Sequence, residues 1–181
     1  MSDQSSSESS ALVQAIVEIL DQGEMLLTEV SDDVYTRTLP SAFNASIGGH
    51  YRHCLDHFRG LLEAVPAGDL NYDHRERGTL VETDRFAALN ATRELRHGWR
   101  QVDREQLGRA IGVTCKTSYA TSGSQTAESS VGREIMYCVA HAVHHYALIG
   151  IMSAMMDLKL PAGFGVAPST LKHQEQTARA A

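Results

Sequence analysis

The sequence predicts an all-α protein, a four-helix bundle that carries a short β-hairpin between its third and fourth long helices. Apolar residues recur at intervals of three and four positions over four long stretches, which is the pattern of helices that bury one face. Capping serines, together with Pro66 and Gly68, mark where these stretches begin and end. Residues 111–119 alternate apolar and polar instead, which is typical of a strand in a hairpin.

The four helices are expected at about residues 11–29, 47–65, 83–106 and 131–157. Ser10, Ser46 and Ser130 stand immediately before the first, second and fourth of them, where a hydroxyl can accept bonds from free backbone N–H groups. Residues 31–45 and 66–81 lack helical periodicity and are rich in turn-forming residues, so we expect them to be loops.

Both ends of the chain are expected to lie outside the bundle. Residues 1–10 are serine-rich and of low complexity, a composition that favours a disordered N-terminal tail. Residues 166–181 are mostly polar and are expected to form a loose C-terminal tail. The bundle domain is therefore expected to span residues 11–165, a length that allows one sizeable core.

The composition argues against two classes of partner. The chain has 181 residues, is 43% hydrophobic and 21% charged, and carries a formal net charge of -6, so it has no basic surplus for a nucleic acid. Its apolar runs are interrupted well short of the ~20 residues of a membrane span. Its first residues lack the basic start and apolar core of a signal peptide. We therefore expect a cytoplasmic protein without a nucleic-acid or membrane partner.

Cysteine and methionine usage points to packing and assembly. The chain has three widely spaced cysteines, Cys54, Cys115 and Cys138. An odd number at such spacing predicts reduced thiols that pack as small apolar side chains, rather than a disulfide framework. Met152, Met155 and Met156 place apolar side chains at the end of the last helix, where they could pair two copies of the chain. A homodimer is therefore one expectation.

The strongest signal is a pair of histidine clusters. The second helix carries His50, His53 and His57, and the fourth carries His141, His144 and His145. Residues three or four apart project from the same face of a helix, so each cluster places imidazoles side by side. Buried imidazoles need polar partners, because an unsatisfied buried polar group costs about 1–3 kcal/mol. Either a divalent metal ion or ordinary hydrogen bonds can supply those partners.

Two clusters on different helices favour the metal. A single His-x-x-x-His is a weak signal, because the same spacing arises on any solvated helix face. Bundles, however, build metal sites from facing helices, and two separate clusters fit that arrangement. Imidazole suits Zn, Ni, Cu and Fe, and the sequence does not distinguish Zn, Ni or Fe. Three protein ligands with an open position would be typical of a catalytic site.

Two motifs resemble the DinB/YfiT-like superfamily over roughly residues 11–160. The first is Ser46-Ile-Gly-Gly-His-Tyr-Arg-His53 with Asp56, and the second is His141-x-x-x-His145 in the last helix. The resemblance implies a bundle with its helices in up-down-down-up order. It also implies a metal site in which His53, seven positions after its serine cap, joins His141 and His145 as ligands.

The resemblance also implies a chemistry. Members of the superfamily include transferases and isomerases that use a low-molecular-weight thiol such as bacillithiol or mycothiol. The chain departs from the superfamily at Tyr146-Ala147-Leu148, where Arg-Gly-Gln usually follows the last histidine, so no role is carried over to these residues. Periodicity places His50 nearer than His53 to the apolar stripe of its helix, which leaves His50 or His57 as alternative ligands.

Several polar residues are candidates for the surroundings of the metal. They are His50, Asp56, His57, Arg75, Arg77 and His144. An aspartate can orient a ligand imidazole by accepting its second N–H, and the two arginines can bind a carboxylate or thiolate of a substrate. The alternatives are a solvated aspartate, a partly solvated histidine face and a loop held by its own ion pairs.

The function expected from these residues is that of a divalent-metal-dependent enzyme acting on a small molecule, and the resemblance implies a thiol-dependent S-transferase or a related hydrolase or isomerase. A metal ion held by three histidines would lower the pKa of a bound water or thiol toward ~7. One alternative is a bundle that binds a metal or ligand without catalysis and has no deep pocket beside the histidines. The plainest alternative is a structural bundle with hydrogen-bonded core histidines.

Overall fold

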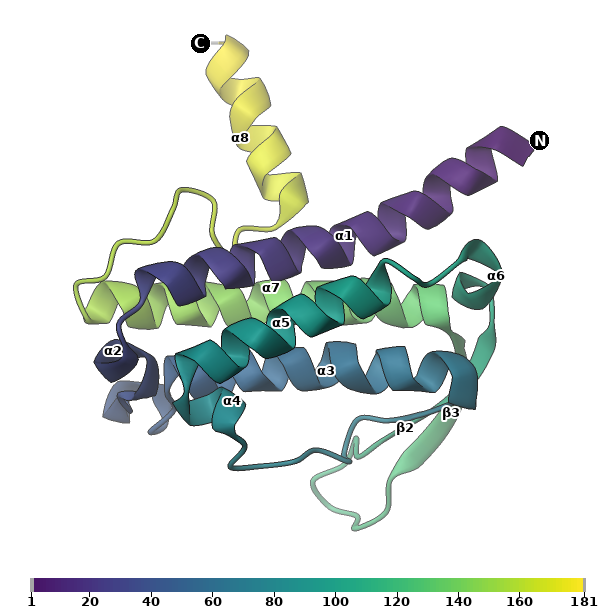
Figure 1. Ribbon diagram of the computed structural model, residues 1–181, viewed down its shortest axis with the longest axis horizontal. Helices are drawn as coiled ribbons and strands as arrows, with labels where there is room; N and C mark the ends of the chain where they lie inside the picture. Colours follow the sequence, from purple (N-terminus) through teal and green to yellow (C-terminus); the bar gives the residue numbers. More distant parts are fainter. Residues whose placement is uncertain (1, 181) are drawn as a thin grey trace.

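Four long helices run side by side in a computed structural model that describes the backbone of residues 2–180 and the side chains of residues 11–179 (Figure 1). They are α1 (Ser2–Glu29), α3 (Ile47–Ala67), α5 (Arg85–Trp99) and α7 (Val131–Met155). Helix α3 packs against both α5 and α7, and α1 packs against the same two helices. The protein is therefore mostly helical, as expected, while the up-down-down-up order stays a prediction.

A small three-stranded sheet joins α3 to α7. Strand β2 (Ala110–Cys115) pairs antiparallel with β3 (Gln125–Ser130), which forms the expected hairpin. Strand β1 (Asp69–Asn71) adds to β2 in parallel, although its segment was expected to be a loop. The start of β1 is held in place because the Gly112 N–H donates to the Gly68 carbonyl (2.8 Å).

The expected caps of the two histidine-bearing helices are confirmed. Ser46 Oγ accepts from the N–H of Gly49 (3.0 Å), and Ser130 Oγ accepts from the N–H of Arg133 (3.3 Å). Gly68 ends α3 in a left-handed conformation with a φ of 86°, which glycine adopts at little steric cost. Local capping therefore sets where α3 and α7 begin.

The helix expected at residues 83–106 is instead three separate helices. Helix α4 (Leu80–Thr83) is followed by Asp84, whose side chain accepts from the N–H groups of Phe86 and Ala87 in the first turn of α5. The chain turns after α5, and Asp103 caps the short helix α6 (Arg104–Leu107) through a capping box. Aspartate favours caps over helix interiors because its carboxylate binds free backbone N–H groups, and this preference overrides the apolar periodicity.

Short helices also occupy the loop expected between α1 and α3. They are α2 (Asp32–Thr36) and the 3-10 helix η1 (Pro40–Ala42). Ser31 Oγ caps α2 by accepting from the Val34 N–H (3.3 Å). The buried Tyr35 of α2 donates through its hydroxyl to the Val81 carbonyl (2.6 Å) and so ties this segment to α4.

Both ends of the chain are helical in the structure rather than irregular. Helix α1 begins at Ser2 rather than at Ala11, and no proline or glycine in residues 2–10 interrupts it. The expected loose tail contains α8 (Pro168–Ala180), which projects from the body of the molecule in Figure 1. Proline fits the first turn of a helix, and strong helix formers follow it.

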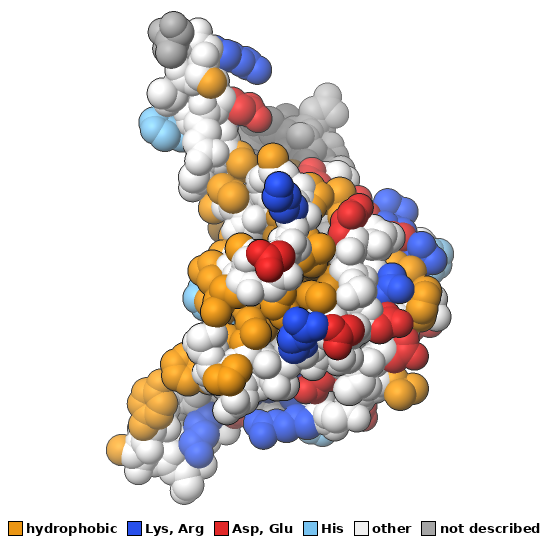
Figure 2. Space-filling view, turned by 90° about the vertical axis from the view of Figure 1, so that its left-hand side faces the viewer, with side chains coloured by type: hydrophobic (Ala, Val, Ile, Leu, Met, Phe, Trp, Pro, Cys, Tyr) orange, Lys and Arg blue, Asp and Glu red, His pale blue; other side chains and the backbone are white. Residues whose placement is uncertain are grey.

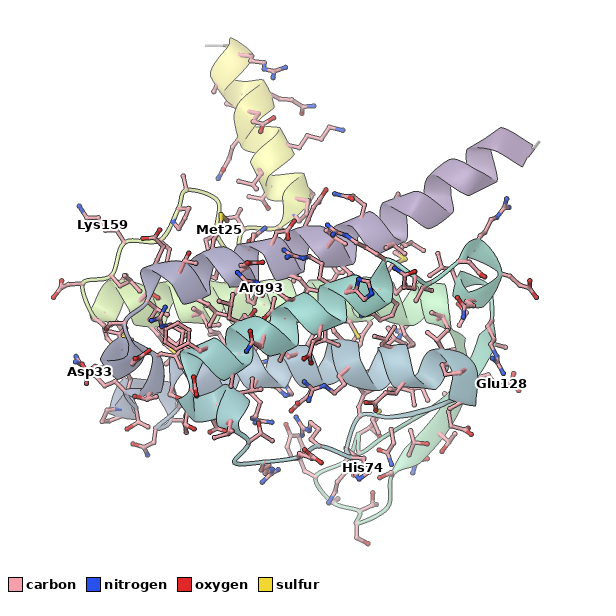
Figure 3. The ribbon with its side chains drawn as sticks, in the orientation of Figure 1. Met25, Asp33, His74, Arg93, Glu128 and Lys159 are labelled. Carbon is pink, nitrogen blue, oxygen red and sulfur yellow. The ribbon has the colours of Figure 1, made fainter. Side chains whose placement is uncertain are left out.

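The core between the helices contains tyrosines that reach polar partners. Tyr51 and Tyr146 are fully buried, and their rings stack at 6.2 Å between α3 and α7. The Tyr51 hydroxyl lies 2.6 Å from Thr92 Oγ1, and the Tyr146 hydroxyl donates to a carbonyl of α1 (3.1 Å). At the surface, Arg93 of α5 donates to Glu24 of α1 (2.7 Å; Figure 3). These bonds tie α1 and α5 to each other and to the histidine-bearing helices.

Among the described residues, α7 is the one helix long and apolar enough, by length and composition alone, to cross a membrane. In this fold it packs against α1 and α3 and buries apolar side chains there. A third of this apolar stretch is buried, so packing accounts for part of its hydropathy. The expected cytoplasmic location stays a prediction.

The end of the molecule where α7 finishes shows many hydrophobic side chains at its surface (Figure 2). Ile151 and Met155 of α7 are 60% and 53% exposed. Met152 is buried instead, because it lies on the face of α7 that packs in the core, so it contributes nothing to an assembly surface. The homodimer stays a prediction.

A carboxylate is buried in the first turn of α7. Glu134 is 1% exposed, and its two oxygens accept from the Tyr72 hydroxyl (2.7 Å), the Ser129 hydroxyl (2.6 Å) and Arg133 (2.7 Å). Burial raises the pKa of Glu134, but these hydrogen bonds and the Arg133 charge outweigh it and hold the pKa below its ordinary value. The carboxylate therefore stabilises the junction between β3, α7 and the loop that contains Tyr72.

Replacing this carboxylate with an amide should weaken the fold. In a Glu134→Gln variant, one carboxylate oxygen is replaced by an NH2 group, which would face the hydrogen-bond donors that the oxygen accepted from. The free energy of unfolding at neutral pH should therefore fall by about 2–3 kcal/mol. Because the pKa is lower in the folded state, the stabilisation is present above about pH 4.5 and is lost as the pH falls through the folded pKa. Urea titrations across that range should show the two proteins converging at low pH. Glu128→Gln, at an exposed position of β3, serves as the control, and a pH-independent gap would contradict the assignment.

Candidate metal centre

The two histidine clusters come together where the sides of α3 and α7 face each other, next to the buried stripe of each helix. The buried positions of α3 form a stripe that includes Tyr51, Cys54 and Phe58. On α7 the buried stripe runs through Cys138, Ala142, Tyr146 and Ile149. His141 and His145 lie beside this stripe and not on it, because Tyr146 takes the core position. Both histidines are therefore half-buried at the edge of the α3–α7 contact.

His53, His141 and His145 converge at this edge. Each offers a ring nitrogen, and these nitrogens all lie within 4.8 Å of one another. The Nε2 atoms of His53 and His141 are 3.0 Å apart. The ring centroid of His145 lies 4.7 Å from that of His53 and 4.6 Å from that of His141. The structure thus brings together the three residues that the sequence motifs selected.

The spacing of the His53 and His141 nitrogens fits a metal ion. In a tetrahedral zinc site with Zn–N bonds of about 2.0–2.1 Å, the ligand nitrogens lie roughly 3.3 Å apart. The distance between His53 Nε2 and His141 Nε2 is close to this value. A hydrogen bond between two imidazoles would also account for that pair, and the third ring has an imidazole partner of its own, because His145 Nδ1 lies 2.8 Å from His50 Nδ1. A divalent ion bound between the rings would give all three a common partner.

The three imidazoles are held in the neutral form, which is the form that binds a metal. Burial lowers the pKa of His53 to about 2, and His57, His145 and His141 add to the shift. Burial also lowers the pKa of His141 to about 4 and that of His145 to about 3. Each ring therefore keeps a nitrogen lone pair at neutral pH.

Two neighbours decide which ring nitrogens are engaged. His50 Nδ1 lies 2.8 Å from His145 Nδ1, so Nε2 is the nitrogen of His145 that is left for a metal. Arg75 Nη1 lies 2.8 Å from His53 Nδ1. An arginine can only donate, so His53 Nδ1 is the acceptor in this contact. Arg75 therefore lies at the site, as expected, but its partner is a histidine.

A cavity of about 510 Å³ opens beside the histidines. Its walls come from the starts of α3 and α4, from α7, from the segment that precedes α3 and from the loop before α4. The charged and imidazole side chains that line it are His50, Arg52, His53, Arg75, Arg77, Glu82 and His145. The histidine cluster is therefore open to a small molecule on the side where the arginines lie.

Comparison with known proteins identifies the fold. No family model matches the chain. The structure is similar to the crystal structure of a DinB-like protein, YjoA, from Bacillus subtilis, with a TM-score of 0.61. The similarity covers 85% of this chain and 98% of that one, at 18% sequence identity. The chain has a DinB-like fold. This confirms the DinB-like fold implied by the two motifs, while the order of the helices stays a prediction.

A second similarity is local. The chain is 36% identical over 104 residues to FK506-binding protein 5 from Rhizopus delemar. The matched residues make up 58% of this chain, and the match covers 27% of that protein. The chain therefore spans about a quarter of that protein's length, and no activity is carried over from it.

In the DinB-like fold of this chain, two further histidines border the cluster. His57 is buried, its Nδ1 lies 2.9 Å from the His53 carbonyl, and its ring centroid lies 4.3 Å from that of His141. Its backbone bond engages one ring nitrogen and holds the imidazole beside the site. His144 is exposed, with its ring centroid 5.4 Å from that of His145. Of the two, only His57 is fixed in place by a hydrogen bond within the described residues.

Asp56 does not orient a ligand imidazole in this DinB-like fold. Its carboxylate accepts from Arg52 (2.5 Å), which lies one turn earlier on α3, and Arg52 also donates to Glu82 of α4 (3.0 Å). The four-residue spacing on one helix makes this ion pair the nearest partner for the carboxylate. Arg77, by contrast, lines the cavity as expected.

Sequence reasoning missed the aromatic rings beside the cluster. Tyr137 stacks on His141, with centroids 5.7 Å apart and planes inclined by 19°. Tyr72 stacks on His57, with centroids 4.9 Å apart. The spacing of four residues between Tyr137 and His141 on one helix could have revealed the first contact. The second joins a loop to a helix and has no local signal.

Proposed function

We propose that this protein is a divalent-metal-dependent enzyme that acts on a small molecule, with His53, His141 and His145 as the metal ligands. The observation that carries the proposal is the convergence of three neutral imidazoles beside a cavity of about 510 Å³. Three protein ligands leave a position for water or substrate, which is the arrangement of catalytic zinc sites. A bundle that only stored a metal would not need such a cavity.

The residues around the cluster would prepare it for this role. A divalent ion bound there would lower the pKa of a water or thiol toward ~7 and would act as a Lewis acid. His50 holds the ring of His145 through its Nδ1 atom, which keeps the opposite nitrogen directed away from that bond. Tyr137 stacks on His141, His57 lies against it with the ring planes inclined by 32°, and both restrict its rotation.

The proposed reaction is thiol-dependent S-transfer, or a related hydrolysis or isomerisation. A low-molecular-weight thiol would lose its proton to solvent, and its sulfur would form a bond to an electrophilic carbon of the substrate. The leaving group would depart with the electron pair of the broken bond. The motifs shared with the DinB/YfiT-like superfamily support this choice. The cytoplasmic location, the homodimer and the lack of nucleic-acid or membrane partners belong to the same proposal.

The test is turnover by protein purified without a histidine tag. Samples loaded with Zn, Ni or Fe(II) would be incubated with bacillithiol, mycothiol or glutathione and an aryl halide, and the thioether product would be measured by mass spectrometry. We expect turnover with at least one metal, and loss of at least roughly 100-fold in a His53→Ala variant. His97→Ala, at an exposed position of α5, should keep full activity. Bound metal without any product would favour the non-catalytic bundle.

A further inference from the structure

We infer that Arg75 couples metal binding to the binding of an anionic group, and that the cavity beside the histidines accepts a small molecule carrying a carboxylate. This inference rests on the proposed metal site. It starts from the contact between Arg75 Nη1 and His53 Nδ1 (2.8 Å). Because arginine only donates, this contact places the ring hydrogen of neutral His53 on Nε2. The charges that line the cavity then indicate what Arg75 binds once it leaves His53.

The contact between Arg75 and His53 is incompatible with a metal-bound ring. His53 Nε2 lies 3.0 Å from His141 Nε2, so Nε2 is the nitrogen that would bind a metal shared by the two histidines. A neutral imidazole that binds a metal through Nε2 carries its hydrogen on Nδ1. That N–H and the guanidinium of Arg75 are both donors, so they repel one another. Binding of the metal would therefore release Arg75 from His53.

The released guanidinium lies in a cavity that contains a second arginine without an ion pair among the described side chains. Among the side chains that the structure describes, no carboxylate forms an ion pair with Arg75 or Arg77. Arg52 lines the same cavity but is paired with Asp56 (2.5 Å) and Glu82 (3.0 Å). The metal-loaded site would thus face two arginines that lack an acidic partner.

The chemistry of this cavity selects a carboxylate-bearing molecule. A guanidinium presents donors in a planar fork that matches the two oxygens of a carboxylate. A volume of about 510 Å³ suits a small molecule rather than a polymer. One end of that molecule would face the histidines while its carboxylate binds Arg75 and Arg77. Because coupling between two sites is reciprocal, the carboxylate should also strengthen metal binding.

The test measures zinc affinity by competition with a chelator, using the full chain at constant ionic strength. Each titration is run with no addition, with succinate, and with succinamide as the uncharged control. In the wild type, succinate should tighten zinc binding by roughly five- to tenfold, and succinamide should not. Circular dichroism of each variant checks that the helices are intact.

Three variants separate the two roles of Arg75. Arg75→Gln should bind zinc severalfold more tightly than the wild type without succinate, because the donor-only guanidinium is replaced by an amide whose oxygen can accept from His53 Nδ1–H, and it should not respond to succinate. Arg77→Gln should have wild-type zinc affinity without succinate and a reduced response to it. Arg59→Gln removes a positive charge from α3 outside the cavity, so it should behave as the wild type in every titration.

The outcomes distinguish failure of the inference from failure of the proposed function. If the wild type binds no zinc, nickel or iron, both the proposed function and the inference are wrong. If zinc binds but Arg75→Gln matches the wild type in every titration, only the coupling is overturned. A succinate response that persists in Arg75→Gln would show that the carboxylate binds the metal itself, which also overturns the coupling.

Discussion

A His141→Ala variant should lose the metal. Its ring supplies one of the three converging nitrogens and lies 3.0 Å from His53 Nε2, so its removal leaves two imidazoles on one side of the ion. Loss of a residue that merely orients a ligand costs about 10–100-fold in affinity, so loss of a ligand should cost more than roughly 100-fold. Elemental analysis of protein purified without a histidine tag should show about one metal per chain in the wild type and almost none in the variant.

A matched control is available on the same helix. His144 is exposed and is not part of the converging set, so His144→Ala should retain the metal. Bound metal should also stabilise the wild type by about 2.7 kcal/mol when its free concentration is 100 times the dissociation constant, and a chelator should remove this increment. If chelator-treated and untreated wild type unfold at the same urea concentration, the histidines are structural.

The second large effect is expected at Gly48, in the first turn of α3. A Cβ atom there would lie 2.1 Å from the Glu82 carbonyl oxygen and 2.9 Å from the ring of Tyr35. Neither neighbour can easily yield, because the first belongs to the backbone of α4 and the second is fully buried. Gly48→Ala should therefore lower the free energy of unfolding by about 2–3 kcal/mol, in the range of overpacked cores.

Gly60 offers the comparison within the same helix. A Cβ at this position would meet the Leu70 side chain at 3.5 Å, which is ordinary van der Waals contact. Alanine is a better helix former than glycine, so Gly60→Ala should raise the free energy of unfolding by about 0.5–1 kcal/mol. Urea denaturation of both variants measures the difference. Equal stabilities would mean that α4 does not pack against α3 as described.

The helices that carry the histidines could be predicted because their signals are local. Caps such as Ser46 and Ser130 precede long periodic stretches, and both signals agree. The break at Asp84 could not be seen in this way, since periodicity continues across it while the carboxylate starts a new helix. Strand β1 has only three residues, and its pairing with β2 depends on a segment about 40 positions later in the chain.

The candidate site likewise has features that local sequence predicts and features that depend on tertiary packing. The spacing of His141 and His145 and the distance of His53 from its cap are local features of the sequence, and they select the three rings that converge. Their position on the flanks of the helices, and not on the buried stripes, depends on which neighbouring side chains fill the core. The contact of Arg75 with His53 depends on the path of an exposed loop, which no local pattern encodes.

The sheet gives the histidine-bearing helices a common attachment. Strand β1 follows Gly68, where α3 ends, and β3 finishes at Ser130, where α7 is capped. At the far end of the hairpin, the Ser124 hydroxyl donates to Asp73 (2.8 Å), two residues before Arg75. A fluorescent dye attached at the hairpin tip would therefore lie away from the α3–α7 contact and would respond when the loop that contains Arg75 moves. Its fluorescence would report ligand binding as a function of time.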